Sequence, residues 1–402
     1  MAKLSDVAAI NPTRKVKKGE FVPFIQMAAL PLSGRDISVS DVEIRVAKAA
    51  GAHFQNGDTL LARITPCLEN GKTAQVNVLA DGAVGEGSTE FIVLCGHDSE
   101  DNDFVYYLCR EPEFRKFAIS RMEGTSGRQR VSWQSIAEYP IELPSPDIRR
   151  DAAGFLATLD DRIANLRQTN ATLLAIAAGL FKSRFVDFDG VPPGDMQESE
   201  LGLIPKGWRA EEIGKLVQCV GGATPSTKDE VFWNGGLHHW ATPKDLSGLQ
   251  APILITTERR ITDAGVARIS SGLLPAGTLL MSSRAPIGYL AIAAVPVAIN
   301  QGFIAMLPGG ALSPVWLLFW AQVNMEAIKQ KANGSTFMEI SKAAFRPIKV
   351  VQPPTDALAQ FDEVAAPMLE RIQNNERHIA TLAAIRDALL PRLLSGQLRV
   401  PQ

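Results

Sequence analysis

An internal repeat spanning about half the chain constrains the fold of this 402-residue sequence more than any other feature. The stretch from Asp160 to Ile176 matches the stretch from Leu369 to Ile385, so equivalent residues lie 209 positions apart. Three further pairs of motifs recur in the same order: Gly57-Asp58-Thr59-Leu60-Leu61-Ala62-Arg63 with Ala276-Gly277-Thr278-Leu279-Leu280 and Arg284 a little downstream, Gly124-Thr125-Ser126 with Gly334-Ser335-Thr336, and Tyr139-Pro140-Ile141-Glu142-Leu143-Pro144 with Arg346-Pro347-Ile348-Lys349-Val350. Such repeats indicate similar structural units, so the sequence predicts the order globule, helix, globule, helix.

Apolar residues in both repeated stretches recur at alternating steps of about three and four, which is the heptad pattern of a coiled coil. The first stripe consists of Leu156, Leu159, Ile163, Leu166, Asn170, Leu173, Ala177 and Leu180. The second consists of Phe361, Ala365, Met368, Ile372, Asn375, Ile379, Leu382, Arg386 and Leu389. Each stripe contains one asparagine, which lowers stability but fixes register because it needs a polar group opposite it.

The two asparagines predict how the helices pair. If the helices run antiparallel about a centre near Gln168, Asn170 falls opposite Asn375. The same centre predicts two further facing pairs: Leu173 with Ile372, and Ile163 with Leu382. We therefore expect both amides in one layer of an antiparallel pair. The alternative is that each helix packs separately on its own globule.

Proline-rich stretches mark the boundaries between these segments. Leu143 to Asp147 precedes the first helix, with Asp147 as the expected N-cap, and Pro367 is expected to kink or break the early turns of the second helix. The expected divisions are a globule over 1–146, a helix over 147–186, a linker over 187–200, a globule over 201–353 and a helix over 354–397. Short β-branched runs and helical stretches mix inside the globules. The predicted fold class is therefore α/β (α+β), with two pseudo-repeated globules separated by two long antiparallel coiled-coil helices.

Composition favours a folded protein and argues against several classes. A hydrophobic share of 46% with 21% charged residues fits ordinary globular packing. A net charge of -2 argues against a freestanding nucleic-acid binder, which is usually basic. The four cysteines show no C-x-x-C spacing, so reduced thiols are expected rather than disulfides or a zinc cluster. With neither a signal peptide nor a membrane-spanning run in evidence, we expect a cytoplasmic protein with no membrane partner.

The motifs of a catalytic centre are missing from the sequence. Gly71-Lys72-Thr73 looks like the end of a phosphate-binding loop, but Pro66 stands where the first glycine of that loop belongs. His238 and His239 are adjacent rather than spaced to share a metal. The sequence also lacks the Asn-Pro-Pro-aromatic run that amino-methylating enzymes use on a flipped base. We therefore expect no catalytic residue, no metal and no cofactor in this chain.

Taken in order, the motifs resemble those of the specificity subunits of type I restriction-modification systems over nearly the whole chain. In the first half the resemblance rests on Leu4-Ser5-Asp6-Val7, Ile10-Asn11-Pro12, Val22-Pro23-Phe24-Ile25, Met27-Ala28-Ala29-Leu30 and Gly57 to Lys72. In the second half it rests on Ile204-Pro205-Lys206-Gly207-Trp208, Gly221 to Ser226, Trp240 to Leu246, Arg284 to Gly288, Asn300-Gln301-Gly302-Phe303 and Gly334 to Ile340. Small departures occur at Cys219, Ala223 and Arg386.

The resemblance implies DNA recognition without catalysis. It implies two target-recognition domains, 1–146 and 201–353, that each read one half of a split, asymmetric site in double-stranded DNA. It also implies two modification (methyltransferase) subunits, which bind S-adenosylmethionine, and restriction (translocase/nuclease) subunits. A helix from Asp147 to Phe185 would be roughly 57 Å long, so the helices would act as a ruler between half-sites about one DNA turn apart. Their outward faces, with Arg162, Arg167, Arg371 and Arg377, either dock the modification subunits or are simply solvated.

Loops with arginines, amides and hydroxyls are the candidate DNA contacts, because these groups read base edges and phosphates. The first loop offers Thr125, Ser126, Arg128, Gln129 and Arg130, and its counterpart offers Gly334, Ser335 and Thr336. Arg63 and Arg284 each follow an apolar strand, where they either face DNA or pair internally with a carboxylate. Lys244 lies in a turn after Trp240 and is a candidate phosphate contact. Either loop could instead be a plain surface turn.

Two functions of other classes compete with DNA recognition. A DNA methyltransferase or nuclease with duplicated DNA-binding modules would bind S-adenosylmethionine or a metal by itself. A structural adaptor whose globules bind protein would show no salt-dependent association with DNA, even with its partners present.

Overall fold

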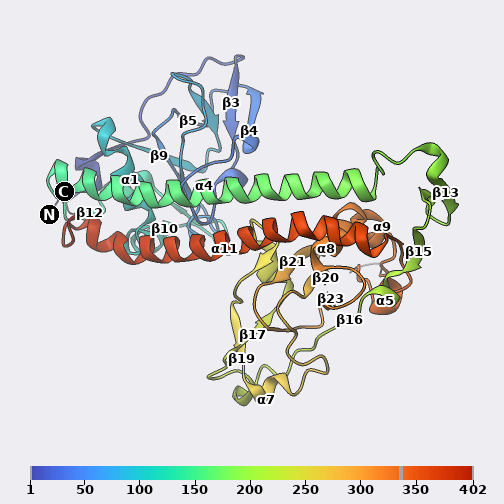
Figure 1. Ribbon diagram of the computed structural model, residues 1–402. Helices are drawn as coiled ribbons and strands as arrows, with labels where there is room; N and C mark the ends of the chain where they lie inside the picture. Colours follow the sequence, from blue (N-terminus) through green and yellow to red (C-terminus); the bar gives the residue numbers. More distant parts are fainter. Residues whose placement is uncertain (1, 126, 335–337, 401–402) are drawn as a thin grey trace. The chain divides into compact units, whose positions relative to one another are not determined.

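The computed structural model describes residues 2–125, 127–334 and 338–400 and divides into two compact units (Figure 1). Unit 1 comprises Met1–Asn165 with Ile379–Gln402, and unit 2 comprises Leu166–His378. Each unit contains a globule of strands and short helices together with part of each of two long helices. These helices are α4 (Pro146–Phe185) and α11 (Thr355–Leu394).

Two sheets form the globule of unit 1. The main sheet has the order β2 (Ala8–Ile10), β9 (Phe91–Gly96), β6 (Thr59–Ala62) and β7 (Thr73–Gln75), with every neighbour antiparallel. The second has the order β4 (Val42–Val46), β3 (Phe21–Ile25), β8 (Gly85–Gly87) and β5 (Ala52–Phe54), in which β3 and β8 are parallel. All four residues of β6 are buried, and the three apolar ones, Leu60, Leu61 and Ala62, follow one another along the strand.

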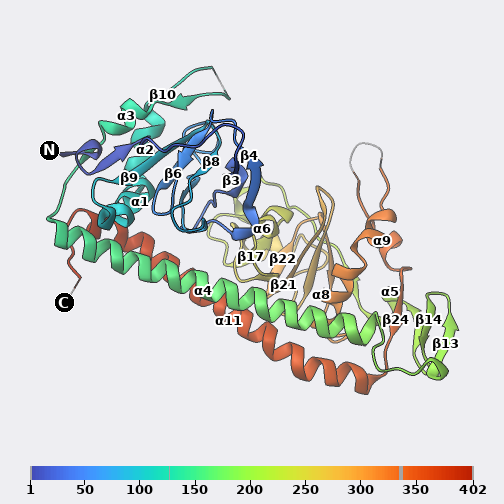
Figure 2. The ribbon, with the colours of Figure 1, turned by 90° about the horizontal axis from the view of Figure 1, so that it is seen from above.

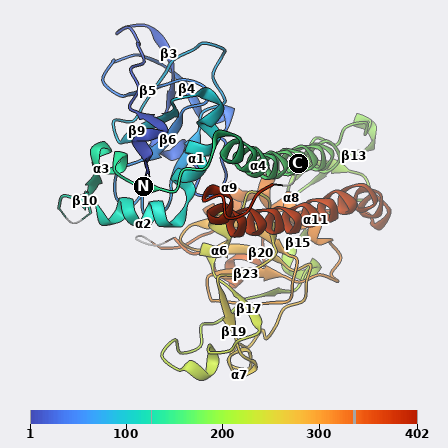
Figure 3. The ribbon, with the colours of Figure 1, turned by 90° about the vertical axis from the view of Figure 1, so that its left-hand side faces the viewer.

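Helices and short ladders complete unit 1. The helices are α1 (Asn102–Arg110), α2 (Pro112–Ser120) and α3 (Trp133–Ala137), and α1 lies against β9 and β6 (Figures 1 and 3). The two-stranded ladders are β1 (Ala2–Lys3) with β12 (Pro140–Ile141), and β10 (Met122–Glu123) with β11 (Arg130–Val131). Short 3-10 helices lie at Leu4–Asp6, Met27–Ala29, Val39–Asp41 and Ser99–Asp101.

Unit 2 repeats this plan with small additions. Its main sheet has the order β16 (Cys219–Val220), β23 (Phe303–Met306), β20 (Leu279–Ser283), β21 (Ile287–Ala293) and β18 (Ile253–Leu254). Its second sheet has the order β19 (Arg259–Ile261), β17 (His238–Ala241) and β22 (Val297–Ile299), in which β17 and β22 are parallel. Its short helices are α5 (Ile213–Leu216), α6 (Pro243–Ser247), α7 (Asp263–Val266), α8 (Pro314–Val323), α9 (Met325–Gln330) and α10 (Lys342–Phe345).

The predicted internal repeat is present as a repeat of topology. The order β2-β9-β6-β7 in unit 1 corresponds to β16-β23-β20-β21 in unit 2. The register also repeats, because the amide of Leu4 donates to the carbonyl of Tyr139 at 2.9 Å, and the amide of Ile213 donates to that of Ile348 at 2.9 Å. Both partners in unit 2 lie 209 positions after their counterparts in unit 1, the spacing found in the sequence.

Several expected boundaries differ from the observed ones. Helix α4 begins at Pro146, so Asp147 lies in its first turn and is not the N-cap. Proline suits that first helical position because it lacks an amide hydrogen that would be unpaired there anyway. Helix α11 runs through Pro367 without a break and ends at Leu394, three residues before the expected 397.

The stretch expected to be a linker, 187–200, contains regular structure. A 3-10 helix at Pro193–Asp195 is followed by β13 (Met196–Ser199), which forms an antiparallel hairpin with β14 (Gly202–Pro205). A further ladder joins β15 (Arg209–Glu212) to β24 (Lys349–Gln352). Another 3-10 helix spans Glu230–Phe232. Among the described residues no helix is both long and apolar enough to cross a membrane.

In unit 2 the two long helices are joined through their asparagines, and the helices lie side by side (Figure 2). The Asn375 amide donates to the Asn170 side-chain oxygen at 2.7 Å, and the Asn170 amide donates to Glu376 at 2.7 Å. Both asparagines are buried, and burial also raises the pKa of Glu376. The predicted placement of the two amides in one layer is therefore confirmed.

In unit 1 a charged pair joins the two helices. Arg386 Nη1 of α11 donates to Asp160 Oδ1 of α4 at 2.5 Å, and both side chains are buried. Farther along α11, Leu390, Leu393 and Leu394 belong to the core of unit 1 together with the residues of α1. The alternative in which each helix packs only on its own globule is therefore wrong.

The predicted apolar stripe of the first helix fails at its C-terminal end. Leu180 is 41% exposed, whereas Phe181 is 1% exposed. Phe181 packs edge-on against Trp316 and Phe361, with ring centroids 5.4 and 5.9 Å away. The last step along the stripe is thus four residues from Ala177 rather than three, because a straight helix drifts relative to a strict heptad.

We predict that the asparagine pair is energetically coupled. In Asn375→Ala the buried Asn170 oxygen loses its donor, which should lower the free energy of unfolding by about 1 to 3 kcal/mol. Asn170→Ala should do the same, and the double variant should lose less than the sum of the two. Denaturant unfolding followed by tryptophan fluorescence measures this in unit 2, which holds Trp208, Trp233, Trp240, Trp316 and Trp320.

Gln168, an exposed residue of α4, provides the control. Gln168→Ala should change the unfolding free energy little, because its side chain is solvated. Strictly additive effects of the two asparagine substitutions would contradict a structural role for their hydrogen bond.

Candidate nucleic-acid interface

In unit 1 the first predicted DNA-contacting loop is the tip of the β10–β11 hairpin, where Met122 pairs with Val131 and Glu123 with Arg130. Gly124 has φ +125°, a conformation that favours glycine, and begins the tip. The return limb is fixed to the chain after β6, since the Thr65 amide donates to the Gln129 carbonyl at 3.0 Å and the Val131 amide to the Arg63 carbonyl at 3.0 Å. The hairpin therefore has an anchored base and an exposed tip.

The two arginines of this loop have different surroundings. Arg130 Nε lies 3.0 Å from both carboxylate oxygens of Glu90, and its Nη2 lies 2.7 Å from one of them. Arg128 is exposed, and within the described part of the chain its guanidinium has no hydrogen-bond partner. Arg130 therefore holds the loop in place, while the donors of Arg128 remain available to a ligand.

The remaining candidates of the first loop are only partly described. Thr125 is exposed and accepts the amide of Arg128 at 3.0 Å through its carbonyl, which closes the turn. Gln129 is half-buried, and its carbonyl bonds to Thr65. Ser126 lies outside the described residues.

Arg63 is half-buried at the end of β6 and lines a cavity of about 340 Å³. Its Nε is buried without a hydrogen-bond partner in the described part of the chain, and so is Nε2 of His53, which lines the same cavity. Among the described residues no carboxylate pairs with Arg63. The alternative in which Arg63 pairs internally with a carboxylate is therefore not what the structure shows.

In unit 2 the counterpart loop has the same backbone frame. The amide and carbonyl of Asn333 exchange hydrogen bonds of 2.9 and 3.0 Å with Glu339, and Gly334 has φ +121°, close to the φ of Gly124. The Ile340 amide donates to the Ser283 carbonyl at 3.0 Å, as Val131 does to Arg63. Gly334 is exposed, and the candidates Ser335 and Thr336 lie outside the described residues.

Arg284 and Arg63 do not occupy equivalent positions. The matching hydrogen bonds make Ser283, not Arg284, the counterpart of Arg63. Neighbouring residues of a strand point to opposite faces, so the two arginines serve different surroundings. Arg284 Nη1 lies 3.6 Å from Glu339 Oε2, and both residues line a groove of about 700 Å³ that also includes Lys329.

Lys244 lies in the first turn of α6 and not in an irregular turn. Its ammonium group is 2.8 Å from a Glu258 carboxylate oxygen, and its side chain is 76% exposed. An exposed ion pair of this kind contributes little to stability. The lysine is therefore accessible, but a phosphate that binds it would have to replace the Glu258 carboxylate.

Sequence reasoning missed a basic and aromatic cluster at β19. The Arg259 guanidinium lies 3.8 Å from the ring centroid of Trp233 and 5.4 Å from that of Trp240, and that of Arg268 lies 5.6 Å from Phe232. Arg259 is exposed and has no carboxylate partner among the described residues. The run Glu258-Arg259-Arg260 beside aromatic residues was the available signal, because stacked arginines are common in nucleic-acid recognition.

The motifs that suggested other chemistry have structural roles. His238 Nε2 lies 2.6 Å from Asp263, whereas His239 Nδ1 lies 3.2 Å from the Thr257 hydroxyl, so the two rings face different partners. The Lys72 ammonium donates to the Met27 carbonyl at 2.8 Å, inside the fold. In the described part of the chain no group of three or more His, Cys, Asp or Glu side chains is placed to hold a metal ion.

Comparisons with known proteins agree with this geometry. Residues 205–384 match the family model of the type I restriction modification DNA specificity domain. The HindI specificity subunit of Haemophilus influenzae is 24% identical over 90% of this chain and 90% of its own length. Over most of its length the chain is therefore similar to a type I restriction enzyme specificity subunit.

Two further proteins of this kind are similar to the chain to different extents. The MjaIX specificity subunit of Methanocaldococcus jannaschii is 34% identical over 48% of this chain, and the match spans 44% of that relative, less than half its length. The solved S subunit of a type I restriction-modification system from M. genitalium has a TM-score of 0.56 at 15% identity, covering 98% of this chain and 95% of that one. This likeness shows the specificity-subunit fold.

We predict that Glu90 keeps the β10–β11 hairpin in order. Glu90→Gln removes the charge that binds the Arg130 fork, so hydrogen exchange of the backbone amides over 122–133 should become faster, because the return limb opens more often. Hydrogen-exchange mass spectrometry measures this directly. Glu100→Gln, which breaks an exposed ion pair with Arg150 elsewhere in unit 1, should leave that segment unchanged. Equal exchange in Glu90→Gln and the unsubstituted chain would show that Arg130 does not anchor the loop.

Proposed function

We propose that this chain is the DNA-recognition subunit of a type I restriction-modification complex and reads a split, asymmetric site without catalysing a reaction. The observation that carries the proposal is the repeated hairpin. In both units an anchored return limb lies beside the end of a core strand, and Thr125 and Gly334, at the start of the two loops, are exposed. A tip of this kind suits a groove of DNA, where forked donors meet base edges.

An asymmetric site follows from differences between the two tips. The first carries Arg128 and Gln129, and the second begins at Gly334 and continues through Ser335 and Thr336. Where unit 1 has Arg63 beside its hairpin, unit 2 has Ser283. Arginine favours guanine, whereas small hydroxyl residues are less selective. We infer that the two modules read different sequences.

Arg284, Lys244 and the Arg259 cluster are proposed as further contacts from unit 2. Arg284 lines a groove beside the second hairpin, and the groove also offers the apolar surfaces of Ile287 and Met338. Such surfaces suit thymine methyl groups. Arg259 and Lys244 are exposed cations and suit phosphates, which fix position but carry no sequence information.

The long helices are proposed as the spacer between half-sites. Helix α4 has 40 residues, which corresponds to roughly 60 Å at about 1.5 Å per residue. That length exceeds one turn of DNA, roughly 34 Å. We infer that helix length sets the gap between the two sequences that are read.

The partners of the chain are also proposals. Two modification subunits would bind S-adenosylmethionine and dock on the outward faces of the helices, where Arg162 and Arg371 are exposed. Restriction subunits would add translocation and cleavage. The net charge of -2 agrees with partners that supply part of the phosphate contact. A complex that acts on cellular DNA would work in the cytoplasm.

We predict that Arg128→Ala selectively weakens recognition in the assembled complex. Loss of one base-reading arginine should reduce affinity for the cognate site by about 1 to 3 kcal/mol and relax specificity at one base pair. Arg259→Ala should instead weaken all sequences alike and reduce the salt dependence of binding. Binding to a panel of single-base variants of the site, at two salt concentrations, separates the two effects.

Lys116→Ala provides the control, because that exposed lysine of α2 pairs with Glu113 and belongs to neither tip. It should leave affinity and specificity unchanged. An unchanged site preference in Arg128→Ala would exclude this arginine from base reading. Binding of S-adenosylmethionine to the chain alone, or failure of the assembled complex to bind DNA in a salt-dependent way, would overturn the proposed function.

A further inference from the structure

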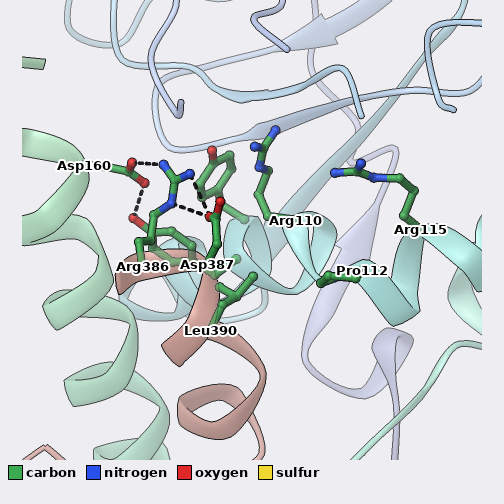
Figure 4. Close-up of a pocket in the computed structure, with 9 residues that line it drawn as sticks. Arg110, Pro112, Arg115, Asp160, Arg386, Asp387 and Leu390 are labelled. Carbon is green, nitrogen blue, oxygen red and sulfur yellow. Dashed lines mark hydrogen bonds and ion pairs between the residues drawn. The ribbon is translucent and has the colours of Figure 1, made fainter. Parts of the chain in front are cut away.

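A small cavity in unit 1, of about 230 Å³, gathers five charged side chains from four helices (Figure 4). It lies among α1, α2, α4 and α11, and none of its lining residues belongs to the β10–β11 hairpin. Its lining consists of Tyr106, Tyr107, Arg110, Pro112, Arg115, Asp160, Arg386, Asp387 and Leu390. The function proposed above assigns no role to this cavity.

On one side of the cavity the charged side chains are paired with one another. Asp160 accepts from Arg386 Nη1 at 2.5 Å and from the Tyr107 hydroxyl at 2.8 Å, so each of its oxygens has a donor. Arg386 Nε also donates to Asp387 at 2.9 Å. The charge of Arg386 is thus balanced by two carboxylates, and this side has no need of a ligand.

The other side carries two arginines without a carboxylate. Arg110 Nη1 donates to the carbonyl of Gly71 at 3.1 Å and more weakly to that of Leu32 at 3.5 Å. Arg115 is half-buried and, among the described residues, has neither a hydrogen bond nor an ion pair from its guanidinium. Burial and then the neighbouring Arg110 lower the pKa of Arg115. Most of the ten donors of the two guanidinium groups are therefore unused.

Gly71 lies close to the guanidinium group of Arg115. Gly71 has φ +75°, and a Cβ atom placed on it would lie 2.5 Å from Arg115 Nη2. Any larger residue at this position would push the guanidinium away. The glycine of the Gly71-Lys72-Thr73 motif thus makes room for an arginine.

The charges that line the cavity do not cancel. Three arginines and two aspartates face it, so the lining has a net charge of +1, and both aspartates bind Arg386 and leave Arg110 and Arg115 without an ion pair among the described residues. Two guanidinium groups close together in a partly desolvated site repel each other unless an anion lies between them. We propose that the cavity binds one small oxyanion, a phosphate or a carboxylate, between Arg110 and Arg115.

The size of the cavity limits the ligand. A water molecule takes up about 30 Å³ in the liquid, so the space suits a single oxyanion group with a few waters and excludes a nucleotide. Planar arginine forks bind both carboxylates and phosphates through paired hydrogen bonds. The site is independent of the proposed DNA-reading tips, so either proposal can fail without the other.

Anion-dependent stability of the full chain tests this site. Thermal unfolding would be followed against inorganic phosphate, acetate and chloride at constant ionic strength and pH. We expect phosphate or acetate, but not chloride, to raise the melting temperature in a saturable way, as ligand linkage requires. A response to phosphate would identify a phosphate site, and a larger response to acetate a carboxylate site.

Arg115→Gln should weaken the apparent affinity at least tenfold. Lys116→Gln, which removes the exposed charge of the next residue, should keep the full response. The comparison uses the slope with anion concentration, so a change in basal stability does not affect it. The same response in Arg115→Gln as in the unsubstituted chain, or a response to ionic strength alone, would overturn the proposal.

Nuclear magnetic resonance gives a second test that needs no variant. The arginine side-chain Nε–Hε signals of the unsubstituted chain would be followed during a phosphate titration and an acetate titration. We expect the signals of Arg110 and Arg115 to shift with saturation, while that of the fully paired Arg386 moves less. Uniform small shifts of all arginine signals would contradict the proposed site.

Discussion

One buried polar contact in each unit fixes how α4 and α11 lie against each other. In unit 2 this contact is the hydrogen bond between Asn170 and Asn375, and in unit 1 it is the ion pair between Asp160 and Arg386. A polar group in an apolar seam is stable only opposite its partner, so sliding either helix by one turn would bury both groups unpaired. The register of the pair then determines which residues of each helix end reach the core of each unit.

That register makes each core depend on a distant part of the chain. The core of unit 1 includes Leu390, Leu393 and Leu394, near the end of α11. The core of unit 2 includes Phe181 and Phe185, near the end of α4. Neither globule completes its core from its own consecutive residues. The two modules therefore share one scaffold, in which the main sheets have the same strand order while the hairpin tips differ. A repeated frame with different tips suits the proposed reading of two different sequences.

The sequence predicted those features that depend on periodic patterns. The 209-residue repeat gave the two similar globules, and one asparagine in each stripe gave the antiparallel pairing and its layer. Features made by contacts between distant segments were not predictable. Asp160 is off the apolar stripe and is buried only because Arg386 and Tyr107 bind it. Likewise, no local pattern distinguishes Arg130, which Glu90 holds, from the free Arg128 two residues before it. The exposed Leu180 shows the same limit. Its neighbour Phe181 is buried instead, because Phe181 packs against Trp316 in the aromatic core of unit 2.

DNA reading by two different modules is the central claim, and mapping of methylated bases in genomic DNA tests it most directly. Cells that make the modification subunits would be compared with and without this chain. The account predicts methylated bases at one split sequence with two unlike halves and a fixed gap, present only when the chain is made. Methylation that does not depend on the chain, or that follows a sequence with two identical halves, would contradict it.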